Sequence, residues 1–463
     1  MTAAAGKNDF TQGAVWRVIL RMAIPMMLAQ TVNVLYSVVD RMYIGHMEGV
    51  GSLALTGLGL CMPVVSLITA FSGLCGAGGG PLCSIARGSG DLDYAERVEA
   101  NALTLLLLFG GALTVLLQVF LKPILFAFGA SEATWPYAAG YARVYLCGTV
   151  FVMLSLGMNV FINSQGFARV GMLTVTIGAV LNICLDPLFI FVFGMGITGA
   201  AIATVLSQAV SACWAMGFLL SRRAILTLKR RNMRLRWAIV RRILALGVTG
   251  FVMSITNAIV QISYNVTLGA WGGDLYVGAM TVINSVRELL FMACSGLRDG
   301  AQPVLGFNYG ARVYSRVKAG IRFLCLFVFS YAALAWLCVM LFAGGIVRVF
   351  NSDPEMVAVA VPAMRVFFSG FVFMALMIAG QSVFLGLGKS RQAATFSILR
   401  KVVIVTPLIF LLPRIGGLGV MGVFWSEPIS DLLGGGASFL TMYFTVYRRL
   451  GGDGPNRLEG VKE

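Results

Sequence analysis

The chain has 463 residues, of which 58% are hydrophobic and only 12% are charged, and its mean hydropathy is +0.86. Soluble domains carry about a quarter charged residues, so this composition excludes an ordinary soluble protein and indicates a membrane protein. The nine cysteines form no CxxC pair and fall within or at the ends of hydrophobic runs, which argues against a disulfide framework and against a zinc site.

Apolar runs of about 20 residues, long enough to cross a bilayer, recur along the whole chain. The first follows a short polar tail and lacks a small-residue cleavage site, so it is interpreted as a span and not as a signal peptide. The short loops leave no room for a separate soluble domain. The sequence predicts twelve transmembrane helices, near residues 15–40, 53–80, 98–121, 136–161, 168–193, 197–220, 239–269, 276–305, 319–345, 357–385, 393–413 and 418–446.

The net charge of +16 is divided unequally between the predicted inner and outer loops, which argues against nucleic-acid binding. An excess of Lys and Arg in the inner loops is the positive-inside pattern, and it predicts that both tails, residues 1–14 and 448–463, are cytoplasmic. The basic segment 221–237 is interpreted as a topological anchor that contacts anionic lipid headgroups. With the N-terminus in the cytoplasm, the predicted outer loops hold only four Lys or Arg residues: Arg41, Lys122, Arg348 and Arg414.

The chain contains an internal repeat whose two copies are separated by segment 221–237. Three segments of the first copy align in order, at a nearly constant offset, with the second: 17–45 with 241–269, 80–88 with 302–310, and 166–191 with 386–411. Six crossings return a chain to its starting side, so both copies have the same orientation. The sequence therefore predicts an all-α polytopic membrane protein with two six-helix bundles, an N-lobe (15–220) and a C-lobe (238–447), related by a pseudo-two-fold axis along the membrane normal. A cavity between two bundles that rock against each other is transporter architecture.

Two carboxylates lie within predicted spans of the first copy, and the equivalent positions of the second copy hold no acid. Asp40 follows Tyr36 by four residues, and Asp186 follows Asn182 by four, so on a helix each pair shares one face. A carboxylate at mid-membrane costs about 2.5–3.5 kcal/mol and persists only where something offsets that cost. If the first and fifth spans face each other, the two acids could load and release a proton, or hold Na⁺ when both are ionised.

Structural roles for the two acids are open alternatives. Asp186 precedes Pro187, a combination that suits the start of a helix, so it could cap the continuation of a helix broken at the proline. Pro407 occupies the equivalent place in the second copy, so a kink there would belong to the fold. Asp40 could be an interfacial residue paired with Arg41.

The second copy carries mainly neutral amides along its predicted spans. We expect them to line a substrate cavity, with Glu288 attracting cationic substrates; an ion pair of Glu288 with Arg287 or Arg298 is an equal alternative. The predicted cavity residues are Asn257, Gln261, Asn284, Glu288, Gln302 and Gln381, with Tyr141 and Asn159 from the first copy. Snorkelling or cytoplasmic pairing is expected for charged residues nearer the span ends: Asp299, Arg365, Arg400, Lys401, Glu427 and Asp431.

The sequence contains no pattern for catalysis or for a cofactor. GLGKS (386–390) mimics the end of a phosphate-binding loop, but Val383 replaces the required glycine and the segment joins two spans. The single histidine, His46, lies in a predicted outer loop without a metal-binding partner, and GxSxG is absent. We therefore expect neither an enzyme nor a cofactor-binding protein, and no metal other than Na⁺ at Asp40 and Asp186.

Four segments, VVDRMYIGH (38–46), NSQGFARVGM (163–172), LNICLDPLFIF (181–191) and AQPVLGFNYGA (301–311), resemble the bacterial branch of the multidrug and toxic compound extrusion (MATE) transporters. The resemblance extends over about residues 12–447. It implies a multi-pass protein of the bacterial inner membrane, functional as a monomer, that exports organic cations by alternating access. The driving force it implies is inward flow of protons or sodium ions.

The resemblance also implies a cation-coupling site in the N-lobe, with an Asp on the first helix and an Asn and an Asp on the fifth. These match Asp40, Asn182 and Asp186, and Tyr36 and Thr204 occupy corresponding places.

The C-lobe departs from the family pattern. Some members carry acids on the seventh and tenth helices as a second cation site, whereas this sequence offers Asn257 and Gln261 on the seventh helix and Gln381 on the tenth. The resemblance therefore favours coupling through the N-lobe.

Three other functions are alternatives. A flippase or exporter of lipid-linked saccharides uses a related fold, but it is expected to line its cavity with cations for a pyrophosphate headgroup, whereas the clearest mid-span ionic candidates in the N-half are acidic. An intramembrane enzyme would need a nucleophile or a metal cluster. A passive channel is disfavoured by a two-fold repeat within one chain.

Overall fold

The computed structural model of the chain describes residues 9–47, 50–128, 130–350 and 353–451, and every regular element within these ranges is helical. Residues 1–8 and 452–463, which make up most of the two predicted tails, lie outside the described ranges. The chain divides into two compact units. Unit 1 contains Arg21–Val248, and unit 2 contains Phe10–Leu20 together with the chain from Thr249 onward.

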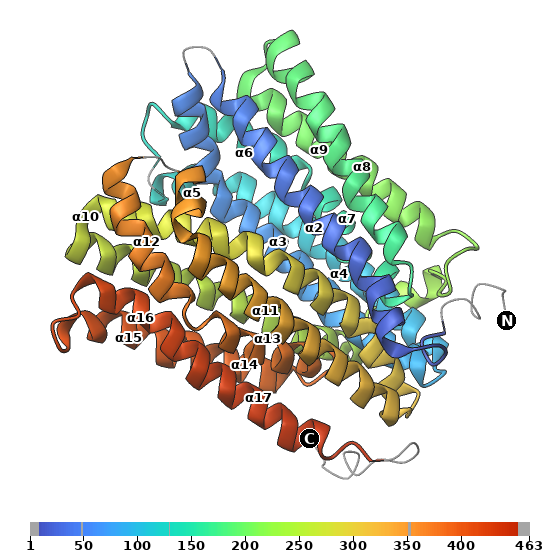
Figure 1. Cartoon of the computed structure of the whole chain (residues 1–463). Helices are drawn as coiled ribbons and strands as arrows, with labels where there is room; N and C mark the ends of the chain where they lie inside the picture. The colour runs from blue at the N-terminus through green and yellow to red at the C-terminus, as the bar shows by residue number, and fades with distance from the viewer. Residues whose placement is uncertain (1–8, 48–49, 129, 351–352, 452–463) are drawn as a thin grey trace. The chain divides into compact units, whose positions relative to one another are not determined.

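Unit 1 is a bundle in which α3 packs against α4 and α7, and α8 packs along α9 (Figure 1). Its buried apolar core lies mainly on α3 and α4, with further residues on α6, α7 and α9. The N-terminus of α4 is capped by Asp91, whose Oδ1 accepts a hydrogen bond from the Tyr94 backbone N–H (2.9 Å), as aspartate typically does there. The helices are α2 (Val15–Gly45), α3 (Gly51–Gly88), α4 (Leu92–Val119), α5 (Leu121–Ala127), α6 (Trp135–Cys147), α7 (Thr149–Ser164), α8 (Ala168–Pro187), η1 (Leu188–Val192), α9 (Gly196–Leu219) and η2 (Arg230–Met233).

Apart from Phe10–Leu20, unit 2 begins within α10 (Trp237–Gly310), which is two helices joined at the non-helical Gly273. In this unit α11 packs against α12 and α13, and α12 packs against α16. The remaining elements are α11 (Tyr314–Phe350), α12 (Pro354–Phe368), α13 (Phe371–Gly386), α14 (Ser390–Ile398), η3 (Leu399–Val405), α15 (Thr406–Leu411), η4 (Leu412–Arg414), α16 (Val420–Ser430), η5 (Asp431–Gly435), α17 (Gly436–Met442) and η6 (Tyr443–Tyr447).

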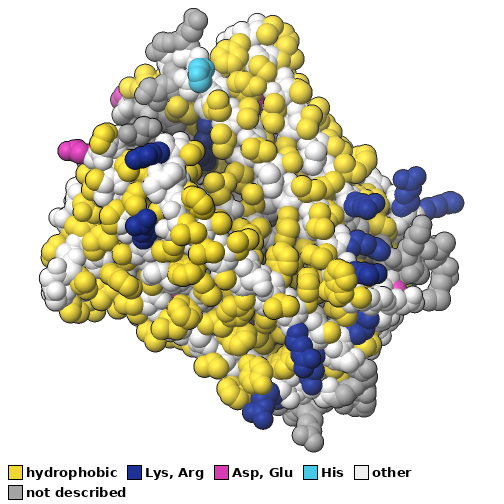
Figure 2. All heavy atoms as spheres, in the orientation of Figure 1, with side chains coloured by type: hydrophobic (Ala, Val, Ile, Leu, Met, Phe, Trp, Pro, Cys, Tyr) yellow, Lys and Arg dark blue, Asp and Glu magenta, His cyan; other side chains and the backbone are white. Residues whose placement is uncertain are grey.

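Nine helices of the described chain are long and apolar enough to cross a membrane, and the number is up to 11 if two bent helix pairs each count as one span. The last predicted span, 418–446, is divided into α16, η5, α17 and η6, each of which is too short for that criterion. Large apolar side chains remain exposed along the helices and cover much of the face seen in Figure 2. Such a surface requires lipid around it, which confirms an all-helical membrane protein.

The two bent pairs occupy equivalent places in the repeat. The pair α6 and α7 bends by 57° at Gly148, and the pair α12 and α13 bends by 46° at residues 369–370. A Cβ atom at Gly148 would lie 2.5 Å from Val205, and one at Gly370 would lie 2.5 Å from Pro428. In both units, therefore, a glycine at the bend lets a following helix pack directly against it.

The first residues of α2 and α10 belong to a different unit from the rest of each helix. In unit 2, Val15 and Ile19 of α2 lie around Gly320 of α11. In unit 1, Gly247 of α10 approaches α3 so closely that a Cβ atom would stand 1.9 Å from the Leu74 carbonyl oxygen. Each of these two helices is consequently shared by both units.

Segment 221–237 is held against the rest of unit 1 by polar side chains of α4 and by Gln165, the residue that follows α7. Glu96 accepts hydrogen bonds from Lys229 Nζ (2.7 Å) and Thr227 Oγ1 (2.6 Å). Gln165 Oε1 accepts from the backbone N–H of Leu226 (3.1 Å). Most arginines of the segment stay exposed, as contact with lipid headgroups would require.

The chain passes Pro187 without a break. Helix α8 continues beyond Pro187 as the π-helical turn η1, so Ala168–Val192 forms one span. The Asp186 side chain caps no backbone N–H of this turn and instead accepts a hydrogen bond from Asn182. The interpretation of Asp186 as the cap of a broken helix is therefore wrong, because the wider π turn accommodates the proline ring.

Gly199 of α9 lies directly against this π turn, where a Cβ atom would stand 2.7 Å from the Phe189 carbonyl oxygen. We predict that Gly199→Ala lowers the free energy of unfolding by about 1–3 kcal/mol, because overpacking displaces backbone. Gly217→Ala is the matched control, since it lies in the same helix with no atom within 4 Å of the added Cβ. Alanine is the better helix former, so this control should be neutral or stabilising. Thermal unfolding in detergent compares the two variants, and equal midpoints would contradict the prediction.

Candidate functional sites

The five residues predicted as a cation-coupling site lie together in unit 1; we call them the cation site. Asn182 of α8 connects two of them, since its Nδ2 donates to Asp186 Oδ1 (3.1 Å) and to Thr204 Oγ1 of α9 (3.3 Å). The carboxyl groups of Asp40 and Asp186 are within hydrogen-bonding reach of each other. Tyr36, one turn before Asp40 on α2, interacts electrostatically with both acids.

The cation site is buried and rich in unsatisfied acceptors. Asp40, Asn182 and Asp186 are 8%, 2% and 0% exposed. One side-chain oxygen of each (Oδ1 of Asp40 and Asn182, Oδ2 of Asp186) has no hydrogen-bond donor within the described chain. Ionised carboxylates only accept hydrogen bonds, so a shared proton or a bound cation would satisfy the two acids together.

Oxygen ligands of this kind suit a hard cation such as Na⁺. Over the part of the chain that the structure describes, no group of three or more His, Cys, Asp or Glu side chains could hold a metal ion.

Arg41, the alternative partner of Asp40, has an exposed side chain and forms no ion pair with it in the described ranges. Asp40 is thus buried against Asp186 and does not form the alternative ion pair with Arg41.

Small residues allow α8 and α9 to carry these groups close together. A Cβ atom at Gly178 of α8 would stand 2.4 Å from Ser211 Oγ of α9. That hydroxyl donates to the Thr174 carbonyl oxygen (3.0 Å). The two helices therefore pack tightly one turn from Asn182, which fixes the spacing between Asn182 and Thr204.

Both first-copy residues of the predicted cavity lie in unit 1. Tyr141 of α6 is 4% exposed, stacks on Tyr145 with ring centroids 5.8 Å apart, and interacts electrostatically with Asp40. Because of this interaction with Asp40, we group Tyr141 with the cation site. Asn159 of α7 donates to the Gly171 carbonyl oxygen of α8 (3.2 Å), a bond that joins two helices.

Two predicted cavity residues of the second copy meet in a chain of amides. Asn284 Nδ2 in the second part of α10 donates to Gln261 Oε1 in its first part (3.2 Å), and Gln261 Nε2 donates to Asn265 Oδ1 (3.2 Å). Asn257, one turn earlier, is exposed. These side chains form a polar strip across the two parts of α10.

The other predicted cavity residues stand apart from this strip. Gln302 is half-buried and its backbone contacts Gly386 of α13. Gln381, on the same helix α13, is 8% exposed, and its Nε2 has no acceptor among the described residues.

Glu288 is exposed and joins neither of its two candidate partners. Arg287 Nη1 lies 3.9 Å from Glu427 Oε1, and Arg298 Nε donates to Asp299 Oδ1 (3.0 Å). The predicted ion pair of Glu288 with Arg287 or Arg298 is therefore absent from the described chain.

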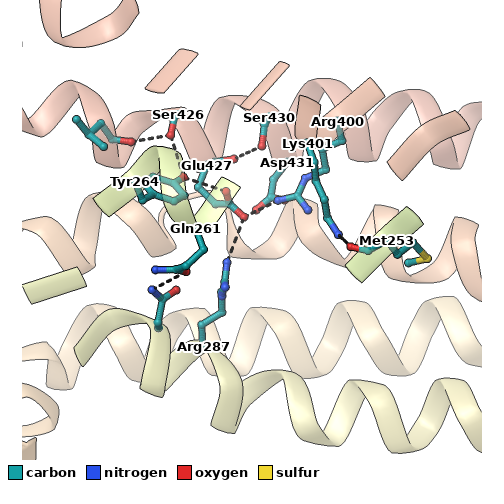
Figure 3. A network of polar contacts seen from close by, with 12 residues as sticks. Met253, Gln261, Tyr264, Arg287, Arg400, Lys401, Ser426, Glu427, Ser430 and Asp431 are labelled. Atoms are coloured by element: carbon teal, nitrogen blue, oxygen red, sulfur yellow. Dashed lines mark hydrogen bonds and ion pairs between the residues drawn. The ribbon is translucent and has the colours of Figure 1, made fainter. Parts of the chain in front are cut away.

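Unit 2 contains a buried group of charges where the sequence pattern indicated span ends (Figure 3). Arg400 Nη2 of η3 lies 2.5 Å from Glu427 Oε1 of α16 and 2.7 Å from Asp431 Oδ1 of η5. These residues are 7%, 6% and 2% exposed. Of the two expectations for these residues, snorkelling or cytoplasmic pairing, snorkelling is wrong, because helix packing sets the acids directly opposite the guanidinium, and charges in a low-dielectric interior must be paired.

Three further side chains extend this group into the ionic cluster. Tyr264 of α10 donates to Glu427 Oε2 (3.1 Å), and Lys401 Nζ donates to the Met253 carbonyl oxygen (3.4 Å). Arg287 approaches Glu427 from the second part of α10 (Figure 3). The ionic cluster consists of Tyr264, Arg287, Arg400, Lys401, Glu427 and Asp431.

One signal in the sequence could have indicated this cluster. Glu427 and Asp431 are four residues apart, the spacing that places two side chains on one helical face. The alignment of 17–45 with 241–269 also pairs Asp40 with Tyr264. Each unit therefore has a buried polar group at an equivalent position of its first helix.

Comparisons with known proteins agree with this architecture. The sequence profile of the MatE family matches residues 25–188 and 250–411, two segments about 220 residues apart, as in the repeat. A multidrug export protein, MepA of Staphylococcus haemolyticus, is 24% identical over 440 residues, which cover 95% of this chain and 94% of the relative.

Solved structures share the fold. A MATE crystal structure in the bent conformation matches with a TM-score of 0.90 at 24% identity, over 97% of this chain and 99% of that chain. A multidrug resistance MATE family transporter in its outward-facing conformation matches with a TM-score of 0.89 at 23% identity, over 97% and 99% of the two chains. The all-helical transporter fold expected from the sequence is thereby confirmed.

Proposed function

The chain belongs to the MatE family of transporters, and from this membership we propose that it exports cationic, amphiphilic compounds in exchange for inward-moving protons or sodium ions. The family is not one of enzymes. The full-length relative that carries the name of a multidrug export protein supports the substrate class, and its bacterial source supports a bacterial plasma membrane as the location.

The observation that carries the proposal is the unsatisfied carboxyl pair of the cation site. Asp40 and Asp186 are buried against each other, and their free oxygens face no donor in the described chain. Two carboxylates repel each other in a low-dielectric environment. A proton or a sodium ion removes this repulsion, so its arrival and departure change how α2 packs against α8.

Asn182 extends this change to a third helix. Because it donates to both Asp186 and Thr204, a shift of Asp186 is passed to α9. In the proposed cycle, cation binding from the outside repacks these helices and disfavours drug binding, so the drug leaves. The two lobes then rock inward, and the cation is released into the cytoplasm.

Purified protein in liposomes tests the proposal, with ethidium as the transported probe. An inward pH gradient and an inward sodium gradient are imposed in separate experiments, and ethidium movement is followed by fluorescence. We expect export that requires one of the two gradients and stops when an ionophore removes it. Ethidium flux that is independent of both gradients would indicate a passive channel and reject the proposal.

A further inference from the structure

Two cations of α11 meet an aromatic ring of η6, the last helical turn of unit 2. Lys318 and Arg322 are four residues apart, a spacing that places both side chains on one face of α11. The centroid of the Tyr447 ring lies 5.9 Å from Lys318 Nζ and 5.8 Å from the Arg322 guanidinium carbon. Arg322 Nε also donates a hydrogen bond to the Tyr447 hydroxyl oxygen (2.5 Å). We call Lys318, Arg322 and Tyr447 the basic site.

The basic site has hydrogen-bond donors for which the described chain provides no acceptor. The ion pairs that the described part of unit 2 forms involve neither Lys318 nor Arg322. Tyr447 accepts from Arg322 and still has its own O–H to donate. Arg448 and Arg449, which directly follow η6, are exposed and add two more positive charges. Because Arg322 is exposed and the other two side chains of the site are half-buried, an anion at the surface could bind all three.

Exposed apolar side chains continue from the basic site along the two helices that form it. Helix α11 stays in contact with the last helix beyond the site, where the Phe329 ring of α11 and the Phe439 ring of α17 have centroids 6.2 Å apart. Leu326, one turn after the site on α11, is 68% exposed, and Leu440 and Phe444 on the last helix are 55% and 51% exposed. A soluble anion gains nothing from these side chains, whereas the acyl chains of a lipid pack against them.

The basic site lies at the ends of its helices and not at mid-membrane. Lys318 and Arg322 occupy the first three turns of α11, and Tyr447 is the last residue of η6. The charge pattern predicts that this end, which residues 448–463 follow, faces the cytoplasm. The cytoplasmic leaflet carries anionic lipids that attract Lys and Arg near its surface, and tyrosine is enriched at the level of the headgroups. These features together favour a phospholipid over a soluble anion.

We propose that the basic site binds the phosphate of an anionic phospholipid whose acyl chains lie along α11 and α17. Lys318 and Arg322 neutralise the charge of the phosphate, and the Tyr447 O–H donates to one of its oxygens. The site belongs to unit 2 and is separate from segment 221–237 of unit 1. This lipid is a structural ligand that stabilises unit 2 and not a transported compound, so the inference goes beyond the proposed export and does not depend on it.

Native mass spectrometry of the purified full-length protein, titrated with dioleoylphosphatidylglycerol, measures the affinity of the first bound lipid. We expect the double variant Lys318→Gln with Arg322→Gln to bind this lipid roughly tenfold more weakly, because two charges near the phosphate are lost. Tyr447→Phe keeps the ring and loses one hydrogen bond, so its affinity should decrease by a smaller factor. The matched control is Arg169→Gln with Arg391→Gln, which removes two exposed arginines from the starts of α8 and α14 and should bind the lipid as the wild type does.

Several results would overturn the inference. Wild-type affinity in the Lys318 and Arg322 double variant would remove the basic site from lipid binding, and an equal loss in the matched control would assign the effect to net charge alone. Glycerol 3-phosphate, which has the phosphate without acyl chains, should not compete with the lipid; competition at similar concentrations would identify a soluble anion as the ligand. The wild type provides a measurement that does not depend on any variant: dioleoylphosphatidylglycerol should raise the thermal unfolding midpoint more than the zwitterionic dioleoylphosphatidylcholine, and equal midpoints would also reject the inference.

Discussion

Replacement of Asp186 by asparagine is expected to abolish gradient-driven export, and replacement of Asp40 by asparagine should do the same. Asparagine has nearly the same shape, and its carbonyl oxygen can still accept the hydrogen bond from Asn182 that Asp186 accepts now. It cannot take up a proton, however, and it carries no charge for a sodium ion. Exchange of one inward proton or sodium ion for one outward monovalent cation moves no net charge, so a tenfold gradient of the coupling ion, about 1.4 kcal/mol, supports roughly a tenfold concentration ratio of the substrate. Without coupling, this accumulation disappears.

Ethidium efflux from liposomes, at equal protein content, measures this loss. Asp93→Asn is the matched control, since Asp93 is an exposed acid in the first turn of α4 and should keep wild-type export. Unfolding midpoints of the two site variants should stay close to that of the wild type, so that a loss of export reports coupling and not folding. Wild-type export with wild-type gradient dependence in both site variants would reject the coupling role of the two acids.

Replacement of Arg400 by glutamine is expected to produce the largest loss of stability, about 3–5 kcal/mol, the usual cost of removing one partner of a buried ion pair. Arg400 is the guanidinium closest to Glu427, and it is also the cation that contacts Asp431, at 2.5 Å and 2.7 Å. Its removal leaves two acids buried with weaker compensation. Thermal unfolding in detergent should show a much lower midpoint, together with reduced protein yield.

Two comparisons identify the cause of this loss. Arg391→Gln removes an exposed arginine from α14, the element that leads into η3, and should be nearly neutral. The double variant Arg400→Gln with Asp431→Asn should be more stable than Arg400→Gln alone, because the remaining acid, Glu427, still interacts with Arg287 and Lys401. An Arg400→Gln protein as stable as the Arg391→Gln protein would show that the buried pairs contribute nothing.

The features that depend on local spacing were predictable from the sequence. Hydropathy located the helices, because a lipid environment forces long apolar runs, and the repeat predicted two similar halves. The four-residue spacing of Asn182 and Asp186 predicted their contact, since a helix fixes that geometry. Whether Asp40 would meet Asp186 depended on how α2 packs on α8, and there the sequence offered only the resemblance to a family.

The features that depend on helix packing or on irregular backbone were missed. Arg400 and Glu427 are 27 residues apart, and nothing in either segment alone indicates that one neutralises the other. Both lie nearer the ends of predicted spans, which suggested snorkelling or cytoplasmic pairing, whereas packing places both in the interior. In the same way, Pro187 suggested a break because its ring clashes with an α-helical turn. The chain continues past the proline with a π turn, which no motif in the sequence indicates.

Helix α2 connects the cation site of unit 1 with residues that belong to unit 2. Asp40 lies near the C-terminal end of this helix, and the residues up to Leu20 pack as part of unit 2. At 1.5 Å of rise per residue, the 20 residues between them form a rod about 30 Å long. Pro25 lies between these two points and removes one backbone hydrogen bond from the helix, so the part of α2 that carries Asp40 is joined to the part that carries Val15 and Ile19 through a position where the helix can bend.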